Sequence, residues 1–196
     1  MKRLGFEVEQ ERMRRFPTDP KVQKGNLAEV VLAEYIVSAT GADLPIYRLR
    51  YNPNVNQSMK GDDVLAFDLD SNPVRIIIGE AKFRSTSSKI VVTEIVEGLV
   101  RSYMGEIPVS LQFVADRLFE TGKADIGEKV LACPRLLAEG KLTLDYVGLL
   151  MSDTRSAERL NQHTENIMHR LAVISFGLES PDSIIGPCYS GLEDAQ

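Results

Sequence analysis

The sequence predicts an α/β fold, in which a central sheet is flanked by helices in the order αβββαβ and further helices follow the core. Two apolar runs carry this prediction: Val74 to Gly79 and Leu142 to Met151 have the composition and length of buried strands. Helical patterns precede and separate these runs, at residues 26–40 and 91–104. The 196 residues can bury a sizeable core, so we expect a single domain.

The first elements are expected to be a helix and a strand. Asn26 is a suitable start for the helix, which continues to about Thr40 and is stopped by Gly41. Residues 1–20 before it are charged and end in a proline-rich break, so we expect an arm or a short helix there. After the helix, Pro45 to Tyr51 alternates in polarity and is expected to form the first strand.

A hairpin is expected next. Val64 to Leu69 forms its first strand, and Val74 to Gly79 is the buried strand that follows. The intervening residues 68–73 are rich in turn formers, which suits a short connection between neighbouring strands. Pairing of the two strands would bring the start of the first and the end of the second to the same end of the sheet.

The polar residues Arg84 to Ser88 are expected to form a mobile connection to the amphipathic helix at 91–104. The later elements are expected in this order: helices near 110–121 and 124–139, a buried strand at 142–151, a helix at 155–169, an apolar segment near 171–176 and a loose tail. We therefore divide the chain into an N-terminal arm (1–20), a core (21–152) and a C-terminal helix, strand and tail (153–196) packed on the same domain.

Carboxylates and an amine gather at one end of the expected hairpin. Asp62 and Asp63 precede its first strand, and Glu80-Ala81-Lys82 ends its second. Residues two apart in a strand point to the same face, so Glu80 and Lys82 project together. Charged groups in such a place are costly to desolvate unless they pair or bind an ion. Hard oxygen ligands that converge on one point suit Mg²⁺ or Mn²⁺ better than zinc.

Acidic residues at strand ends are often turn residues or solvated caps, and an E-x-K triplet is common by chance. Here the acids, the strand, the turn and the buried strand ending in Glu80-x-Lys82 occur in order, which favours a joint functional site. Cys133 and Cys188 lie in no metal-binding spacing, and His163 and His169 fit surface or structural positions on a late helix. A zinc site, a disulfide and a Ser or Cys hydrolase triad are therefore not supported.

Two strings of residues carry a resemblance to a known superfamily: Lys60-Gly61-Asp62-Asp63 and Gly79-Glu80-Ala81-Lys82-Phe83-Arg84. They resemble the PD-(D/E)xK nucleases, whose restriction-endonuclease-like core is αβββαβ, and the resemblance spans roughly residues 22–151. More narrowly, the strings resemble HamA, the nuclease subunit of the Hachiman anti-phage system. The resemblance implies a Mg²⁺-dependent DNase, with Mn²⁺ as a possible substitute, working with a HamB-like helicase that restrains it until foreign or damaged DNA is sensed.

The resemblance also implies roles for individual residues. Asp63, Glu80 and Lys82 would be catalytic, and the metal would be held by Glu29, Asp63, Glu80 and the carbonyl of Ala81. Lys82 would position the attacking water, help to deprotonate it, or stabilise the pentacovalent phosphorus. The residues alone do not separate these three roles, nor one metal ion from two.

Two of these assignments have rivals. On a helical wheel, Glu34 lies nearer to the apolar face of the first helix than Glu29 does, although the resemblance selects Glu29. The helix is apolar on more than one side, so the wheel does not decide. The G-x-D pattern likewise selects Asp63 and leaves Asp62 as a supporting or capping residue.

The charge of the chain bears on its partners. It carries 23 Lys and Arg against 28 Asp and Glu, and the excess of acids lies entirely in residues 99–196. Because phosphate neutralisation supplies much of the affinity for nucleic acids, a stand-alone binder is usually basic. Basic residues do occur near the start and around the expected site: Arg12, Arg14, Arg15, Lys21, Lys24, Arg48, Arg50, Lys60, Arg84 and Lys89. We expect a nuclease subunit that obtains part of its DNA affinity from a partner.

Two other functions are compatible with the same residues. One is a stand-alone restriction or repair nuclease of the same superfamily, and the other is a non-catalytic assembly module on a nuclease scaffold. The presence of Asp63, Glu80 and Lys82 together argues against the module. No apolar run is long enough to span a bilayer and the start lacks a signal-peptide core, so we expect a cytoplasmic protein without a membrane partner.

Overall fold

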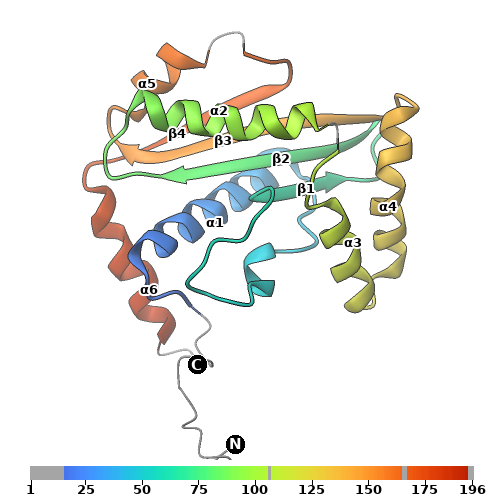
Figure 1. Ribbon diagram of the computed structural model, residues 1–196, viewed down its shortest axis with the longest axis horizontal. Coiled ribbons are helices and arrows are strands. Elements are labelled where there is room, and N and C mark those ends of the chain that lie inside the picture. Colours follow the sequence, from blue (N-terminus) through green and yellow to red (C-terminus); the bar gives the residue numbers. More distant parts are fainter. Residues whose placement is uncertain (1–15, 106, 165–166, 194–196) are drawn as a thin grey trace, which may run out of the picture.

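A mixed four-stranded sheet in the order β1-β2-β3-β4 lies at the centre of the fold (Figure 1). The structure is a computed structural model and describes residues 16–105, 107–164 and 167–193. β1 (Val64–Asp68) pairs antiparallel with β2 (Val74–Phe83), and β3 (Leu142–Asp153) and β4 (Leu171–Leu178) continue the sheet in parallel. The predicted α/β class and the predicted hairpin are confirmed.

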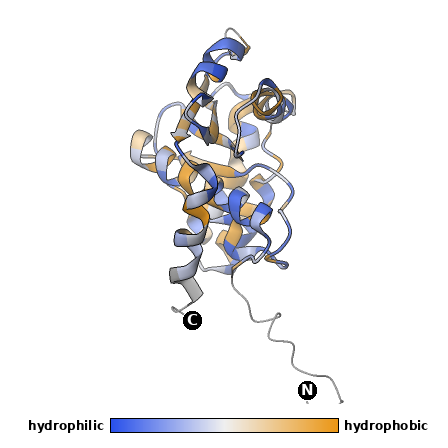
Figure 2. Ribbon diagram, turned by 90° about the vertical axis from the view of Figure 1, so that its left-hand side faces the viewer, coloured by the Kyte–Doolittle hydropathy of each residue, from blue (hydrophilic) through white to orange (hydrophobic). Residues whose placement is uncertain are grey.

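Helices cover both faces of the sheet (Figure 1). The described helices are α1 (Pro20–Thr40), α2 (Lys89–Met104), α3 (Leu111–Glu120), α4 (Ala124–Ala138), α5 (Ser156–His163) and α6 (Ile185–Glu193). α1 packs on one face of the sheet and α2 on the other, while α6 contacts α1. Figure 2 shows the apolar residues concentrated in the sheet and on the sides of the helices that face it. None of the described helices is long and apolar enough to cross a membrane.

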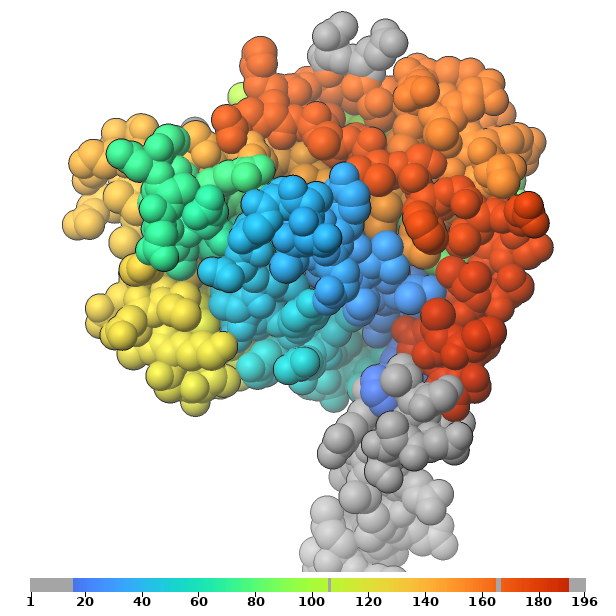
Figure 3. Space-filling model, turned by 180° about the vertical axis from the view of Figure 1, so that it is seen from behind, coloured from blue at the N-terminus to red at the C-terminus, as the bar shows by residue number. Residues whose placement is uncertain are grey.

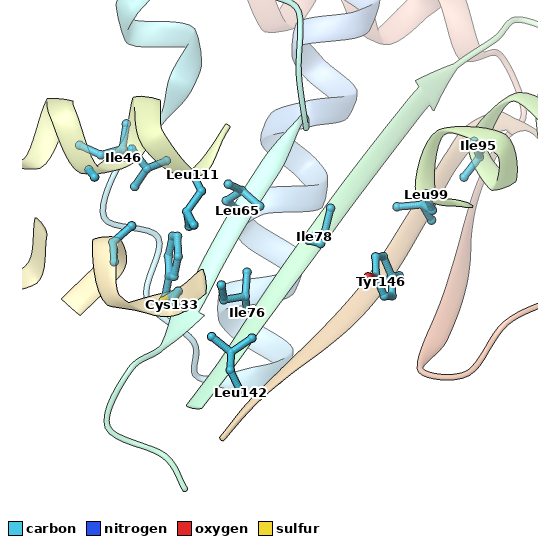
Figure 4. Close-up of a cluster of buried hydrophobic side chains, with 14 of the residues drawn as sticks. Ile46, Leu65, Ile76, Ile78, Ile95, Leu99, Leu111, Cys133, Leu142 and Tyr146 are labelled. Atoms are coloured by element: carbon cyan, nitrogen blue, oxygen red, sulfur yellow. The ribbon is translucent and has the colours of Figure 1, made fainter. Parts of the chain in front are cut away.

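Alternate side chains of β2 enter two separate apolar clusters. Ile76 and Ile78 join the cluster that α2, α3 and α4 cover, which Figure 4 shows with Ile95, Leu99 and Leu111. Ile77 and Ala81 join the other cluster, with α1. Strand residues alternate between faces, so Glu80 and Lys82 belong to the face of α2, whereas α1 lies against the opposite face. The ends of β2 are thus within reach of side chains from both layers.

The predicted strand at 45–51 is wrong. Arg48–Tyr51 forms the 3-10 helix η3. Among the residues that the structure describes, the segment between α1 and β1 meets the sheet in one isolated bridge, between Asp43 and Phe67. The buried Arg48 side chain donates a hydrogen bond to the carbonyl of Lys60 at 2.6 Å, which holds the segment against the loop before β1 rather than along its edge. Within the described residues the chain passes from α1 to β1 without an intervening strand, so the predicted αβββαβ order is not met.

α1 begins six residues earlier than predicted, at Pro20. The carboxylate of Asp19 accepts hydrogen bonds from the backbone N–H groups of Lys21 and Val22, and a proline in the first turn needs no N–H partner. The predicted stop at Gly41 is confirmed, because this residue has a φ of 70°. Most of the predicted arm, residues 1–15, lies outside the described part of the chain.

Two further expectations are wrong towards the C-terminal end. α5 ends at His163 instead of 169, and the expected loose tail contains the 3-10 helix η4 (Pro181–Ile184) and α6. The tail is held by the buried Ile185 and by the Tyr189 hydroxyl, which donates to the carbonyl of Gln23 in α1 at 3.0 Å. In the connection after β2, which was expected to be mobile, the buried Ser87 hydroxyl donates a hydrogen bond to Asp153 at 2.6 Å.

Candidate active site

The β1–β2 register brings the predicted aspartate and glutamate together. Val64, the first residue of β1, pairs with Gly79, so Asp63 lies next to Glu80. Beyond this point the edge of β2 has no partner strand among the described residues. The Asp63 carboxylate takes the place of a paired strand by accepting the N–H of Ala81 at 2.8 Å. The N–H and C=O of a residue in an antiparallel ladder face the same neighbour, so the Ala81 carbonyl lies on this open edge too.

Glu80 and Lys82 project from the same face of β2, as expected. The Lys82 ammonium pairs with the Glu80 carboxylate, with 2.5 Å between Nζ and Oε1, and both side chains are largely buried. Burial works against the charged amine, but the charge and hydrogen bond of Glu80, with Asp63, raise the pKa of Lys82 overall. The lysine is therefore held as a cation beside the acids.

Glu29 reaches the same place from α1. Burial and then the charge of Asp63 raise its pKa to about 8, against the charge of Arg48. Burial and then the charge of Glu80 raise the pKa of Asp63 to about 7, against the N–H of Ala81. Glu29, Asp63 and Glu80 form what we call the acid cluster. Its members repel one another in a poorly solvated space, and a bound cation would reduce this repulsion.

The rival acid of α1 lies elsewhere. Glu34 accepts the hydroxyl of Tyr47 on the exposed side of the helix. Of the two glutamates that the sequence left open, the structure therefore places Glu29 in the acid cluster and Glu34 outside it.

The adjacent aspartates have different surroundings. Asp62 is only 5% exposed; its carboxylate accepts the Ser102 hydroxyl at 2.9 Å and the Ser110 N–H at 3.0 Å, while its own N–H donates to the Ser110 hydroxyl at 3.0 Å. These bonds tie the start of β1 to α2 and to the N-terminus of α3. The carboxylate of Asp62 is thus bonded to residues that hold the fold together, whereas the carboxylate of Asp63 lies in the acid cluster.

The acids are gathered but are not arranged around an ion. Among the residues that the structure describes, no group of three His, Cys, Asp or Glu side chains has a ready-made metal-binding geometry. The Glu80 carboxylate is held by Lys82, and that of Asp63 by the Ala81 N–H. The donor set nevertheless fits a hard divalent cation, because it consists of carboxylates and an edge carbonyl.

The comparisons with known proteins identify the family. The family model described as HamA matches residues 2–190 of the chain. The chain belongs to the HamA family. A relative named Hachiman protein HamA, from Bacillus cereus, is 37% identical over 170 residues, which make up 87% of this chain and 60% of the relative. The chain therefore spans about 60% of the length of this HamA relative.

Two residues beside the acid cluster of this HamA-family chain were not predicted as part of the site. Arg48 is 7% exposed, and its Nε has no hydrogen-bond partner among the residues that the structure describes. Its charge lowers the pKa of both Glu29 and Asp63. Together with these two acids it lines a small cavity of about 20 Å³, which is room for one water molecule. The sequence marked Arg48 only as one of several nearby basic residues.

The second unpredicted residue is Gly98, on the buried side of α2. A Cβ atom at this position would lie 3.0 Å from Cδ of Glu80 and 3.2 Å from its Oε1. The carboxylate of Glu80 thus occupies space that any other residue at 98 would fill. No local pattern relates Gly98 to the expected site, because the contact crosses from a helix to the sheet.

Proposed function

We propose that this HamA-family chain is a Mg²⁺-dependent DNase, acting as the effector subunit of a Hachiman anti-phage complex under the control of a HamB-like helicase. The observation that carries the proposal is the combination, at one sheet edge, of three mutually repelling carboxylates with a lysine held as a cation. The name of the Bacillus cereus relative, a Hachiman protein, supports the defence role. The sheet edge, the hairpin and the E-x-K strand are compatible with a PD-(D/E)xK nuclease core, which is part of the proposal.

Glu29, Asp63, Glu80 and the Ala81 carbonyl would hold the cation. When bound, Mg²⁺ lowers the pKa of a coordinated water and stabilises charge that develops on phosphoryl oxygens. The chain would supply the oxygen ligands from α1, from β2 and from the residue before β1, so these elements would fix the positions of the ligands.

Lys82 would act on the scissile phosphate as a cation rather than as a base. A group with a raised pKa keeps its proton near neutral pH and is poorly suited to removing one from water. Its ammonium can instead orient the attacking water and offset the negative charge of the pentacovalent phosphorus. Of the three roles that the sequence left open for Lys82, the geometry favours positioning and charge stabilisation.

The acid cluster predicts a pH-dependent stability. The raised pKa values of Glu29 and Asp63 mean that the folded chain keeps protons that the unfolded chain releases from about pH 4 upward. The stability that these protons contribute is complete below that pH and is lost as the pH rises through about 7 to 8. In EDTA, the melting temperature should therefore fall more between pH 6 and pH 8.5 for the wild type than for Glu29→Gln/Asp63→Asn.

Mg²⁺ should counteract this loss, since it binds the ionised acids. We expect Mg²⁺ to raise the melting temperature of the wild type more at pH 8.5 than at pH 6, and to leave that of the double variant unchanged. Equal pH profiles for the two proteins, with no effect of Mg²⁺ on either, would show that the acids do not form a cation site.

Gly98→Ala should separate activity from stability. Alanine is favoured over glycine in a helix by about 1 kcal/mol, so the fold should be retained. The added methyl group forces the Glu80 carboxylate to shift by a few tenths of an ångström, and misplacement of a catalytic group is costly. We expect DNA cleavage to fall by about tenfold or more without a loss of melting temperature.

The matched control is Gly25→Ala in α1, where a Cβ atom would meet nothing within 4 Å. This variant should melt at the same or a higher temperature and cleave at the wild-type rate. If Gly98→Ala also cleaves at the wild-type rate, the position of the Glu80 carboxylate beside Gly98 does not matter for cleavage, which contradicts this prediction.

The proposal is tested by incubating the chain with plasmid, linear duplex and single-stranded DNA in Mg²⁺ or EDTA, with and without the helicase that accompanies it. We expect cleavage that needs Mg²⁺ and that depends on the helicase, consistent with the acidic balance of the chain. Rapid cleavage by the chain alone would show that it is a stand-alone nuclease rather than a subunit controlled by a helicase. If no cleavage occurs under any of these conditions, the chain is better described as a non-catalytic assembly module.

A further inference from the structure

A hollow of about 940 Å³ opens beside the acid cluster, between the start of α1, the segment 47–55 and α6. Figure 3 shows these three parts of the chain on one side of the molecule. Val30, Tyr47 and Leu49 line both this hollow and the small cavity that contains Glu29 and Asp63. The two spaces are therefore neighbours, and a molecule lying in the larger one would pass close to the acids. We call the larger hollow the aromatic groove.

The lining of the aromatic groove combines flat rings with a cation. The Arg50 guanidinium lies over the ring of Tyr47, with 5.6 Å between its carbon and the ring centroid, and Tyr189 lines the groove from α6. The hydroxyl of Tyr47 is bonded to Glu34, which fixes the direction of its ring. Asn26 and Asn52 add amide groups that both donate and accept hydrogen bonds.

The charge of the groove also differs from that of the chain. The described residues that line it include Arg50 and no carboxylate, although acids outnumber bases in the whole sequence. A polyanion would therefore meet less repulsion here than over most of the surface. A neutral apolar ligand would gain nothing from Arg50 or from the amides.

We propose that the aromatic groove binds an unpaired stretch of a DNA strand and leads its backbone to the acid cluster. Tyrosine rings and arginine planes stack on the faces of nucleobases, and those faces are free only where the strand is unpaired. Duplex DNA hides its base faces inside the helix, so the same lining offers it little. The inference rests on the proposed nuclease function for the identity of the strand as substrate, and it names the form of DNA that this site takes.

Binding can be measured without cleavage, by fluorescence anisotropy of a labelled 12-nucleotide single strand in EDTA at low salt. The comparison is a blunt duplex of the same sequence. We expect the full chain to bind the single strand about tenfold more tightly than the duplex. Tyr47→Leu and Arg50→Ala should each weaken binding of the single strand by about five- to tenfold, in line with the contribution of one stacked base.

Three controls separate stacking from a general loss of structure or charge. Tyr47→Phe keeps the ring, so it should bind within about twofold of the wild type. Tyr35→Leu and Arg135→Ala remove an exposed tyrosine and an exposed arginine that do not line the groove, and should also bind like the wild type. Thermal melting of every variant establishes that it is folded at the temperature of the assay.

The inference is overturned if the folded wild type binds no single strand, if it binds the duplex equally well, or if Tyr47→Leu and Arg50→Ala bind like the wild type. Cleavage by the same proteins, in Mg²⁺ with the helicase, separates this result from a failure of the nuclease proposal. If the wild type cleaves DNA and both variants bind the single strand normally, the proposed role of the groove is wrong and the proposed nuclease function stands. If both variants bind the single strand more weakly but no protein cleaves DNA, the groove is a DNA-binding site and the proposed nuclease function is wrong.

Discussion

Lys82→Met should reduce Mg²⁺-dependent DNA cleavage by about 100- to 10,000-fold, the range found when a catalytic acid, base or charge-stabilising group is removed. Methionine keeps most of the length of the side chain but not the ammonium that pairs with Glu80. In the proposed site, the variant would lose the charge beside the scissile phosphate, while Glu29, Asp63 and Glu80 would remain to bind a cation. Mn²⁺ binding, measured by calorimetry, should therefore persist when cleavage is lost.

Lys89→Met is the matched control for this change. Lys89 is exposed at the start of α2, close to the end of β2 in sequence. The control removes the same charge from the same kind of side chain, so it should cleave at nearly the wild-type rate. Wild-type cleavage by folded Lys82→Met would contradict the catalytic role of the lysine, and equal losses in both variants would indicate a general effect of charge.

The two adjacent aspartates should respond to alanine in opposite ways. Asp62→Ala removes the acceptor of the Ser102 hydroxyl and the Ser110 N–H in a buried place, which should lower the free energy of unfolding by about 2–3 kcal/mol. Asp63→Ala removes a carboxylate that burial and Glu80 already disfavour as a charge, so the loss of stability at pH 8 should be smaller. Cleavage should be abolished by Asp63→Ala and should follow the folded fraction for Asp62→Ala.

Urea unfolding at pH 8, with cleavage measured on the same samples below the unfolding transition, distinguishes the two residues. A stable Asp62→Ala that cannot cleave, beside a destabilised Asp63→Ala that can, would reverse the assignment. The comparison is internal, because both substitutions make the same change at neighbouring positions of one loop.

The sequence was most informative where the structure depends on near neighbours. The alternation of β2 was enough to place Glu80 and Lys82 on one face, and the turn before β2 was enough to predict the hairpin that brings in Asp63. These relations involve residues within about one hairpin of each other. They follow from the two-residue period of side chains in a strand, which can be applied to the sequence without the structure.

Relations between distant segments were not accessible in the same way. Residues 45–51 alternate like a strand, but residues 48–51 form a 3-10 helix, and Arg48 at its start bonds the carbonyl of the distant Lys60. The choice between Glu29 and Glu34 depends on which side of α1 meets the sheet, because that helix is apolar on more than one side. The space beside Gly98 and the packing of α6 on α1 likewise arise only when distant elements meet.

The assignment of the acid cluster as a DNA-cleavage site is tested by a single rate measurement. Nicking of plasmid DNA by the chain with the proposed HamB-like helicase is measured in Mg²⁺ and in EDTA, for wild type and Glu80→Gln. Glutamine keeps the shape of the side chain and removes the charge that a cation and Lys82 both require. We expect rapid nicking by the wild type in Mg²⁺ only, and none above background by Glu80→Gln. Nicking by the wild type in EDTA, or equal rates for the two proteins in Mg²⁺, would contradict the assignment.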